Sequence, residues 1–200
     1  MNSAHTESRP DTRQHIIDCG HPLIAAKGFV AVGLAEILSA AGVPKGSFYH
    51  YFPSKEAFGV ALLENYETTY VQKLAALNAQ PNLTGAQRLM TYFESWVESQ
   101  RGDDAARYCL IVKLSAEVSD LSSAMRDRML AATQTVLRHL ADHIRAGQAD
   151  GTIGNPLDAS ALAQWLYEAW LGASLLSKLR CDDSAFIGAM ERTRELLQLN

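Results

Sequence analysis

The sequence has few cysteines and no signal for export. Its three cysteines, Cys19, Cys109 and Cys181, lie far apart and form no CxxC pair. This spacing excludes a disulfide framework and a four-cysteine zinc site. No apolar run follows the N-terminus, so a signal peptide is not indicated. We therefore expect a cytoplasmic protein whose thiols are reduced.

A membrane span is also missing, although one stretch imitates it. Residues 23–43 form an apolar segment in which only Lys27 and Glu36 are charged. Glycines interrupt this segment, and each charge at the centre of a bilayer would cost about 2.5–3.5 kcal/mol. We expect no membrane partner.

The sequence lacks the alternation of polar and β-branched residues that marks strands. Its 200 residues are 48% hydrophobic and 20% charged, as in folded proteins of one or two domains. Apolar residues recur at helical spacing instead. We therefore expect an all-α fold that follows a loose tail at residues 1–10. Helices are predicted near residues 11–27, 33–41, 44–52, 54–77, 86–101, 104–118, 121–148, 156–178 and 184–198.

The first predicted helix contains its own start, interruption and stop signals. Asp11 is placed to cap it, and Gln14 three positions later would complete a capping box. Pro22 removes a backbone hydrogen bond to Asp18 and predicts a kink. Gly28 predicts the end of the helix.

Positive charge is scarce overall, but it is unevenly distributed. The net charge is −4 at neutral pH. Residues 1–55 carry five basic and four acidic side chains, a net +1, whereas residues 56–200 carry thirteen and eighteen, a net −5. A uniformly basic nucleic-acid-binding surface is excluded, but a local one at the front of the chain is not.

Two short predicted helices near the front are joined by a glycine-containing turn at residues 40–43. This arrangement is typical of a helix-turn-helix. In the helix predicted at residues 44–52, Phe48 and Phe52 are four residues apart and are expected to face inward. The side chains that then face outward can hydrogen-bond to phosphates or base edges. The alternative is a solvated turn over an aromatic core. The outward residues are Lys45, Gly46, Ser47, Tyr49 and His50.

The next predicted helix begins with Ser54 and Lys55. A lysine beside the free N–H groups of a helix N-terminus can grip one phosphate. We therefore count Lys55 among the candidate DNA-binding residues.

Residues 37–56, ILSAAGVPKGSFYHYFPSKE, resemble the N-terminal signature of TetR-family transcriptional repressors. The resemblance implies a three-helix DNA-binding domain at residues 11–55 and a helical sensor and dimerisation domain at residues 56–200. It also implies homodimers bound to palindromic operators in double-stranded DNA. By the same resemblance, Tyr49 and Lys55 would contact phosphates, and the outward polar residues of the second helix would lie at the major groove.

Two positions depart from the family pattern. Gly33 stands near the start of the helix predicted at residues 33–41. In the family, a threonine that contacts phosphate is common there, and we include Gly33 among the DNA-binding residues. Pro22 is unexpected in the first helix of the family.

The predicted helices at 121–148 and 156–178 have more apolar positions than one intramolecular face needs. Small residues in the second would allow close helix approach. A four-helix seam between two copies would bury both faces; the alternative is burial inside one chain. The candidate dimerisation residues are Met129, Val136, Leu140, Trp165, Trp170 and Gly172.

Cys109 is the candidate sensing residue. Lys113 lies one helical turn ahead and Arg107 is close by, and positive neighbours favour the reactive thiolate. The alternative is a small buried hydrophobic residue. Residues 109–122 and 166–173 resemble TetR-type repressors that respond to reactive electrophiles and oxidants through cysteine and control detoxifying reductases. That resemblance implies Cys109 as the reacting thiol, and Lys178 is an amine that would lie near it if the two helices pack together.

Other residue clusters suggest alternative functions. Tyr92, Trp96 and Trp165 could line a cavity for a reversible apolar effector, although aromatic residues at helical spacing also form cores. His139 and His143 stand four apart on one helix, but no third ligand is near, so we predict a solvated face and no metal site. Catalytic and cofactor-binding motifs are missing. We therefore expect neither enzyme activity nor a cofactor, with a small thiol-dependent enzyme as the alternative.

Overall fold

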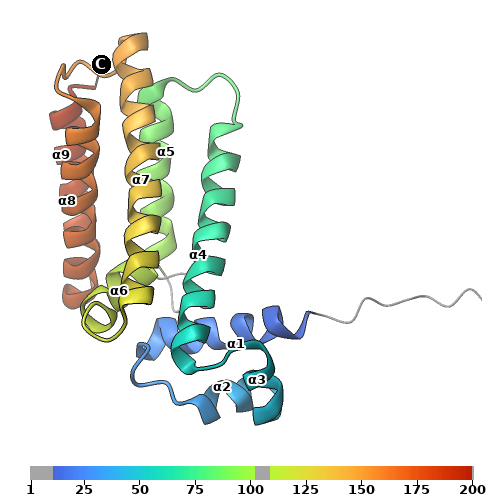
Figure 1. Ribbon diagram of the computed structural model, residues 1–200. Helices are drawn as coiled ribbons and strands as arrows, with labels where there is room; N and C mark the ends of the chain where they lie inside the picture. The colour runs from blue at the N-terminus through green and yellow to red at the C-terminus, as the bar shows by residue number, and fades with distance from the viewer. Residues whose placement is uncertain (1–10, 102–108, 200) are drawn as a thin grey trace, which may run out of the picture.

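The computed structural model describes residues 11–101 and 109–199, which form nine α-helices (Figure 1). The all-α prediction is confirmed, with one isolated bridge between Ile153 and Leu199 in the described ranges. None of the helices described is long and apolar enough to cross a membrane. The helices are α1 (Thr12–Lys27), α2 (Leu34–Ala41), α3 (Lys45–Tyr51), α4 (Lys55–Asn78), α5 (Gly85–Gln100), α6 (Leu110–Val118), α7 (Ser123–Asp150), α8 (Ala159–Arg180) and α9 (Ser184–Leu197).

Helix α1 ends where predicted and differs from its prediction in one detail at its N-terminus. It continues through Pro22 to Lys27 as one α-helix. Asp11 caps it by accepting a hydrogen bond from the N–H of Arg13 at 3.0 Å. Gln14 does not complete a capping box, because its side-chain amide donates to Asp18 at 2.8 Å and to Asn65 of α4 at 2.9 Å.

Helices α1–α3 form a compact unit, called here the head. Its core contains Phe48 of α3 and Phe52, the residue that follows α3, which pack against each other and against Phe58 of α4 with ring centroids 5.2–5.7 Å apart. All three rings are buried, as predicted for the first two. The same core continues into α6 and the start of α7 through Leu110, Leu114 and Met125.

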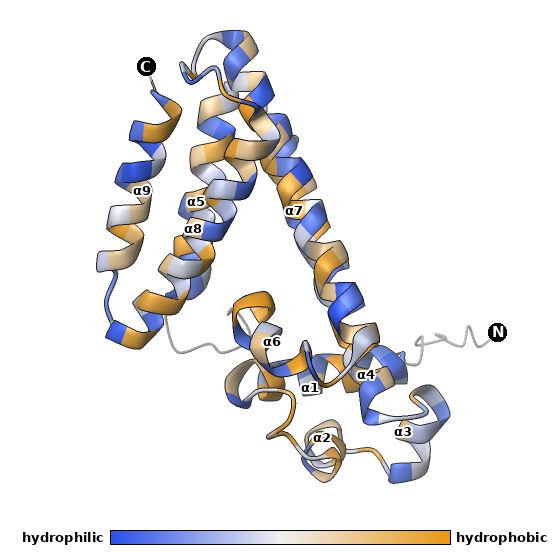
Figure 2. Cartoon of the chain, turned by 60° about the vertical axis from the view of Figure 1, so that its left-hand side comes forward, coloured by the Kyte–Doolittle hydropathy of each residue, from blue (hydrophilic) through white to orange (hydrophobic). Residues whose placement is uncertain are grey.

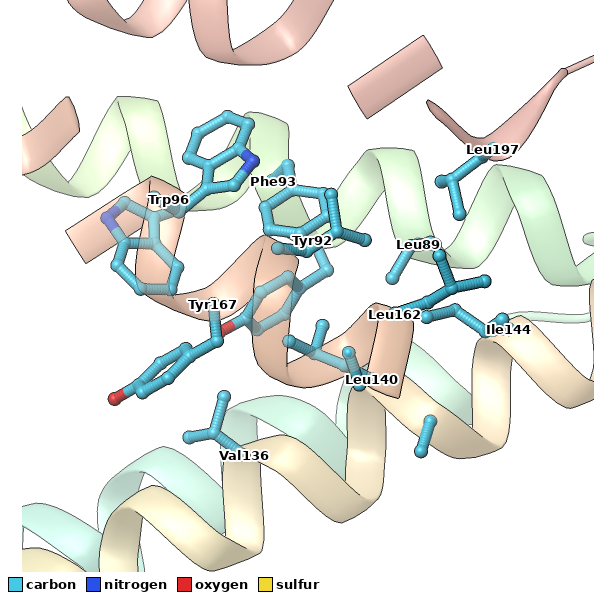
Figure 3. Close-up of a cluster of buried hydrophobic side chains, with 14 of the residues drawn as sticks. Leu89, Tyr92, Phe93, Trp96, Val136, Leu140, Ile144, Leu162, Tyr167 and Leu197 are labelled. Carbon is cyan, nitrogen blue, oxygen red and sulfur yellow. The ribbon is translucent and has the colours of Figure 1, made fainter. Parts of the chain in front are cut away.

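A second core lies among α5, α7, α8 and α9 (Figure 3). Phe93 of α5 stacks on Trp170 of α8 with ring centroids 4.3 Å apart. Val136 and Leu140 of α7 and Trp170 lie in this core, while Met129 lies in the core shared with the head. We therefore correct the predicted assignment of these four residues to a dimer surface. Each is 0–6% exposed and packs within one chain.

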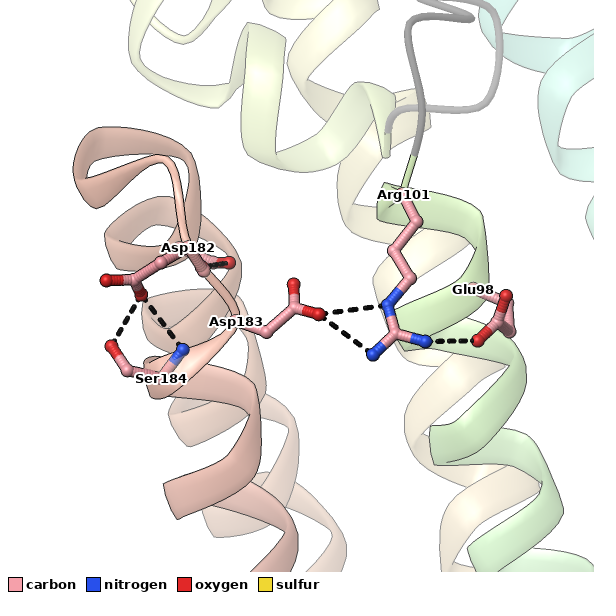
Figure 4. Close-up of polar contacts among 6 residues, drawn as sticks. Glu98, Arg101, Asp182, Asp183 and Ser184 are labelled. Carbon is pink, nitrogen blue, oxygen red and sulfur yellow. Dashed lines mark hydrogen bonds and ion pairs between the residues drawn. The ribbon is translucent and has the colours of Figure 1, made fainter.

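A surface ion-pair cluster joins the end of α5 to the start of α9 (Figure 4). The Arg101 guanidinium donates to Asp183 at 2.8 and 3.0 Å and to Glu98 at 2.6 Å. Asp182 accepts from the N–H and hydroxyl of Ser184 at the first turn of α9. Because these groups are exposed, the cluster positions the helix ends and adds little to stability.

Helices α5 and α7 approach closely at Gly85. A Cβ built on Gly85 would lie 2.1 Å from the backbone nitrogen of Gly147. The N–H of Gly85 donates to the Asp150 carboxylate at 2.8 Å, which lowers the pKa of that carboxyl group. Thr84 and Gln87 complete a capping box at the same helix end. The start of α5 is therefore fixed against the last turns of α7.

Replacing Gly85 with alanine should destabilise the chain by about 1–3 kcal/mol, because the new methyl group meets backbone atoms that cannot rotate away. The midpoint of urea unfolding would measure this. Gly46→Ala is the matched control, since nothing lies within 4 Å of its built Cβ. Equal midpoints for the two variants would contradict the close approach.

Candidate DNA-binding face and sensing thiol

The outer surface of the head presents the predicted DNA-binding side chains on α3. Gly42 ends α2 in a left-handed conformation, with φ 63°, and α3 begins three residues later. Lys45, Tyr49 and His50 are exposed, and the Lys45 ammonium lies 5.8 Å from the centre of the Tyr49 ring. Ser47 is partly buried. The helix-turn-helix arrangement is therefore present, with donors on its outer side.

Two glycines predicted to approach DNA occupy different places. Gly33 is the residue before α2, and its carbonyl accepts from the N–H of Glu36 at 3.1 Å. Gly46 lies in the first turn of α3. Nothing lies within 4 Å of a Cβ built on either residue, so packing within the chain does not require glycine at either position.

Lys55, predicted to grip a phosphate, is held at the loop between α1 and α2. Its ammonium donates to the carbonyl of Phe29 at 2.6 Å and lies 4.6 Å from the centre of that ring. Partial burial lowers the pKa of Lys55, and the nearby Glu117 carboxylate opposes this shift. Lys55 therefore contacts the head and interacts electrostatically with the carboxylate on α6.

Glu117 of α6 holds the backbone of the same loop. Its carboxylate accepts hydrogen bonds from the N–H of Phe29, at 3.0 Å, and from the N–H of Val30. Gly28 precedes this pair with φ 94°, and a Cβ there would lie 2.7 Å from Glu117 Oε2. A side chain at position 28 would therefore be strained and would also displace the carboxylate.

The sequence analysis assigned no role to Glu117. Its partners lie 87 and 88 residues earlier in the chain. They are backbone groups, which leave no pattern of side chains. The left-handed glycine is the one local signal, and it was interpreted as the end of α1 alone.

Helix α6 links the loop contact to Cys109 (Figures 1 and 2). Cys109 is the residue that precedes and caps α6, and Glu117 lies near the other end of the helix. Both views show α6 beside α1, between the head and the remaining helices. Leu110, Leu114 and Val118 of α6 are fully buried in the core that it shares with the head.

Cys109 lies in a less polar environment than expected. Burial is the largest effect on the thiol and raises its pKa, whereas hydrogen bonds from the N–H groups of Ile111 and Val112 and from Tyr66 lower it. The predicted contribution of Lys113 is not among these effects, and that of Arg107 stays a prediction. Lys113 follows on α6, and Arg107 lies outside the described residues.

Lys178 of α8 lies near the same helix, because α6 packs against α8. Partial burial and the charge of Lys113 both lower the pKa of the Lys178 ammonium. These effects favour the neutral amine, which is the nucleophilic form of lysine.

The three aromatic residues predicted to share a ligand cavity are separated. Tyr92 and Trp96 of α5 are buried, and the Trp96 ring N–H donates to Ser174 at 2.8 Å. Tyr167 packs beside Trp96 (Figure 3). Trp165 instead is 51% exposed on the outer side of α8. The prediction that it lines a cavity with the other two is corrected.

Several large apolar side chains are exposed on α8 and α9, whereas the prediction used α7 and α8. Helix α7 is covered by α4, α5 and α8. A shallow groove of about 310 Å³ runs between α8 and α9, lined mainly by apolar atoms. Its lining includes Trp165 and Gly172, both predicted at a dimer seam, together with Leu176 and Gly188.

His139 and His143 are buried, so the predicted solvated face is wrong. Their Nε2 atoms are 3.0 Å apart in a hydrogen bond, and they are 9% and 7% exposed. Burial lowers the pKa of both imidazoles, and that of His139 falls to about 4. Arg88 opposes the charged form of His143, whereas Asp142 favours it. Among residues 11–101 and 109–199, no group of three potential ligands could hold a metal ion.

Comparison with protein families and known proteins gives matches over most of the chain. The family described as bacterial regulatory proteins, tetR family, matches residues 16–62, and the Tetracyclin repressor-like C-terminal domain matches residues 85–193. The HTH-type transcriptional repressor NemR of Escherichia coli (strain K12) is 41% identical over 178 residues, which cover 88% of this chain and 87% of NemR.

Two further comparisons agree. The transcriptional regulator AcuR of Cereibacter sphaeroides is 36% identical over 166 residues, 83% of this chain and 76% of AcuR. The crystal structure of E. coli NemR in its reduced form has a TM-score of 0.89 and 36% identity, covering 95% of this chain and 98% of that one.

The buried histidine pair predicts acid sensitivity. The folded pKa of His139 lies below the ordinary value of 6.5, so stability is full above pH 6.5 and falls as the pH decreases toward about 4. Between pH 7 and pH 5, the natural chain should lose about 2 kcal/mol more than His139→Gln. Urea unfolding at the two pH values would measure the difference. His50→Gln, at an exposed position, is the control and should lose stability with decreasing pH as the natural chain does. The assignment would be contradicted if the stability of His139→Gln also changed with pH as much as that of the natural chain.

Proposed function

Because the chain belongs to the TetR family of bacterial regulatory proteins and is a DNA-binding transcriptional repressor, not an enzyme, we propose that chemical modification of Cys109 releases it from DNA. Residues 11–55 bind the operator in the cytoplasm, and residues 56–200 sense and dimerise. The releasing compound is a reactive electrophile or an oxidant. The contacts of α6 with both regions carry this proposal.

In the proposed complex, α3 enters the major groove of each half-site. Lys45, Ser47 and His50 meet base edges there, while Tyr49 and Lys55 contact phosphates. Gly33 and Gly46 allow the DNA backbone to approach the protein backbone. Because few phosphates are contacted, the salt dependence of binding should be modest.

TetR-family repressors act as dimers, and we propose that this homodimer forms through α8 and α9. The apolar groove between them contains Trp165 and Gly172, and Leu175, Leu179 and Ile187 are exposed on these two helices. Apolar patches of this kind on a monomer are typical of protein interfaces. A palindromic operator would then match the two-fold symmetry of the dimer.

The proposed chemistry at Cys109 is addition or oxidation. With an activated alkene, the thiol loses its proton to solvent, sulfur bonds to the β-carbon, and the α-carbon takes up a proton. With hydrogen peroxide, the thiol first loses its proton to solvent, the thiolate attacks one oxygen, and the O–O bond breaks to give a sulfenic acid and hydroxide, which takes up a proton from solvent to form water. Lys178 is the amine proposed to react further: its neutral nitrogen attacks the sulfenic sulfur, so that an S–N bond forms as the S–O bond breaks and water leaves.

Helix α6 supplies the route from this chemistry to DNA. A group added to the Cys109 sulfur needs space at the first turn of α6, where Leu110 is fully buried. The helix must then move, and Glu117 moves with it. Since Glu117 holds the loop that leads into α2, the head changes its position. A shift of a few ångströms in each head prevents both from docking on the operator together.

Cys109→Ser should bind the operator as the natural chain does but resist release. Treating the natural chain with N-ethylmaleimide or hydrogen peroxide should weaken operator binding at least about tenfold, a typical coupling between two sites. A mobility-shift assay on the DNA upstream of the gene would measure this. Cys181→Ser, at an exposed cysteine, should still be released. Release of Cys109→Ser by both reagents would refute the proposal, whereas release by an unreactive apolar compound would indicate a reversible effector.

Glu117→Gln should separate modification from release. Glutamine keeps one acceptor oxygen and places an amide donor against a backbone N–H, so the loop is held less firmly. Cys109 should still be modified in Glu117→Gln, as a mass shift would show. The loss of operator affinity caused by that modification should be smaller in Glu117→Gln than in the natural chain. The control is Glu36→Gln, which removes a carboxylate paired with Lys27 inside the head. An unchanged ratio in Glu117→Gln would exclude this route.

A further inference from the structure

A tyrosine on α4 contacts the candidate sensing thiol. The hydroxyl group of Tyr66 donates a hydrogen bond to Cys109 Sγ at an O···S distance of 3.7 Å. The two residues are 43 positions apart in sequence and belong to different elements. The contact therefore depends on how α4 packs beside the start of α6.

Hydrogen-bond donors from two helices act on the sulfur atom of Cys109. Tyr66 of α4 bonds to it, and the backbone N–H groups of Val112 and Ile111 in the first turn of α6 lower the pKa of the thiol, although burial outweighs them. The sulfur of a neutral thiol is a weak acceptor. A thiolate gains more from the same donors because it is charged.

Tyr66 is held in place and retains its proton. Its ring stacks on Tyr70 with centroids 6.1 Å apart, and on His21 of α1 at 6.4 Å. Burial raises the pKa of the Tyr66 phenol well above its ordinary value, so the hydroxyl remains a donor wherever the thiol ionises. The orientation of the phenol is therefore fixed before any reaction.

The other titratable groups near the thiol do not replace this donor. Burial raises the pKa values of Tyr70, Tyr92 and Tyr167, which therefore stay neutral as Cys109 ionises. The Tyr70 hydroxyl is engaged with that of Tyr92, at an O···O distance of 2.5 Å. Tyr66 is the phenol that bonds to the sulfur in the described part of the chain.

We propose that Tyr66 is a positioning residue for the thiol chemistry of this repressor: its hydroxyl orients the Cys109 sulfur and stabilises the thiolate that attacks the electrophile. This inference rests on the proposed function, because it gives Cys109 the sensing role. It adds a residue from α4, which leads directly out of the head. Burial disfavours ionisation of the Cys109 thiol. If the Tyr66 hydroxyl is removed, only the two backbone N–H groups remain to offset this effect.

The test is the pH dependence of Cys109 alkylation in the full chain. The thiol proton leaves to the buffer, and the thiolate displaces iodide from iodoacetamide, so the S–C bond forms as the C–I bond breaks. Mass spectrometry of the Cys109 peptide follows this site separately from Cys19 and Cys181. In Tyr66→Phe, the midpoint of the profile should move to higher pH, and the rate near neutral pH should fall roughly threefold to tenfold.

Tyr70→Phe is the matched control, because it removes a hydroxyl one turn further along α4 that bonds to Tyr92 and not to the sulfur. Its profile should keep the natural midpoint. If Tyr66→Phe only loosened the core, alkylation would become faster at every pH with no upward shift in midpoint, and that result would overturn the proposal. So would an unchanged profile. The ultraviolet absorbance of the thiolate, titrated against Cys109→Ser, gives the midpoint even where alkylation is limited by access.

The outcome of the alkylation experiment does not depend on whether modification releases the protein from its operator. A shifted alkylation profile in a protein that N-ethylmaleimide and hydrogen peroxide do not release would support the role of Tyr66 and refute Cys109 as the sensor. An unshifted profile in a protein that is released would refute the role of Tyr66 alone. The two proposals can therefore fail separately.

Discussion

The hydrogen bonds between the Glu117 carboxylate and two backbone N–H groups connect regions that are far apart in the chain. They join the last turns of α6 to the loop between α1 and α2. A carboxylate leaving water needs donors to offset its desolvation, and the loop N–H groups need an acceptor because no helix satisfies them. Each partner therefore requires the other. Lys55 adds a bond to the same loop from α4. These contacts, together with the core that α4, α6 and the start of α7 share with the head, set the position of the head relative to the remaining helices.

The division of the cores agrees with this connection. Helix α6 packs its buried leucines into the core of the head, although it comes after α4 and α5 in the chain. The second core, around Trp170 and Phe93, joins α5, α7, α8 and α9. A thiol at the start of α6 is thus packed against the DNA-binding unit more closely than the division at residue 55 suggests. Movement of α6 disturbs the head more directly than it disturbs the second core.

Residues that act on their own stretch of backbone allowed the local structure to be predicted from the sequence. Contacts between segments that are far apart in the sequence could not be predicted in this way. Gly42 and Pro44 predicted the turn of the helix-turn-helix because each acts on its own backbone. Helical spacing predicted that Leu140 and Trp170 are buried, but an apolar face does not reveal which neighbour covers it, so both were assigned to a dimer seam. His143 was misplaced for the same reason. Glu117 could not be found, since its partners are backbone groups that any sequence possesses.

The Glu117 contact also bears on how such a regulator can diverge. Because the carboxylate recognises backbone N–H groups, it depends on the path of the loop and not on the side chains of Phe29 and Val30. Gly28 is the exception, as its positive φ and the nearness of Glu117 leave no room for a side chain. Residues on the outer face of α3 could therefore change, and the operator preference could change with them, while the hydrogen bonds between Glu117 and the loop are kept. Exchange of heads between related chains would need to conserve this glycine, the carboxylate that faces it, and the apolar side chains of α6 and α7 that complete the core of the head.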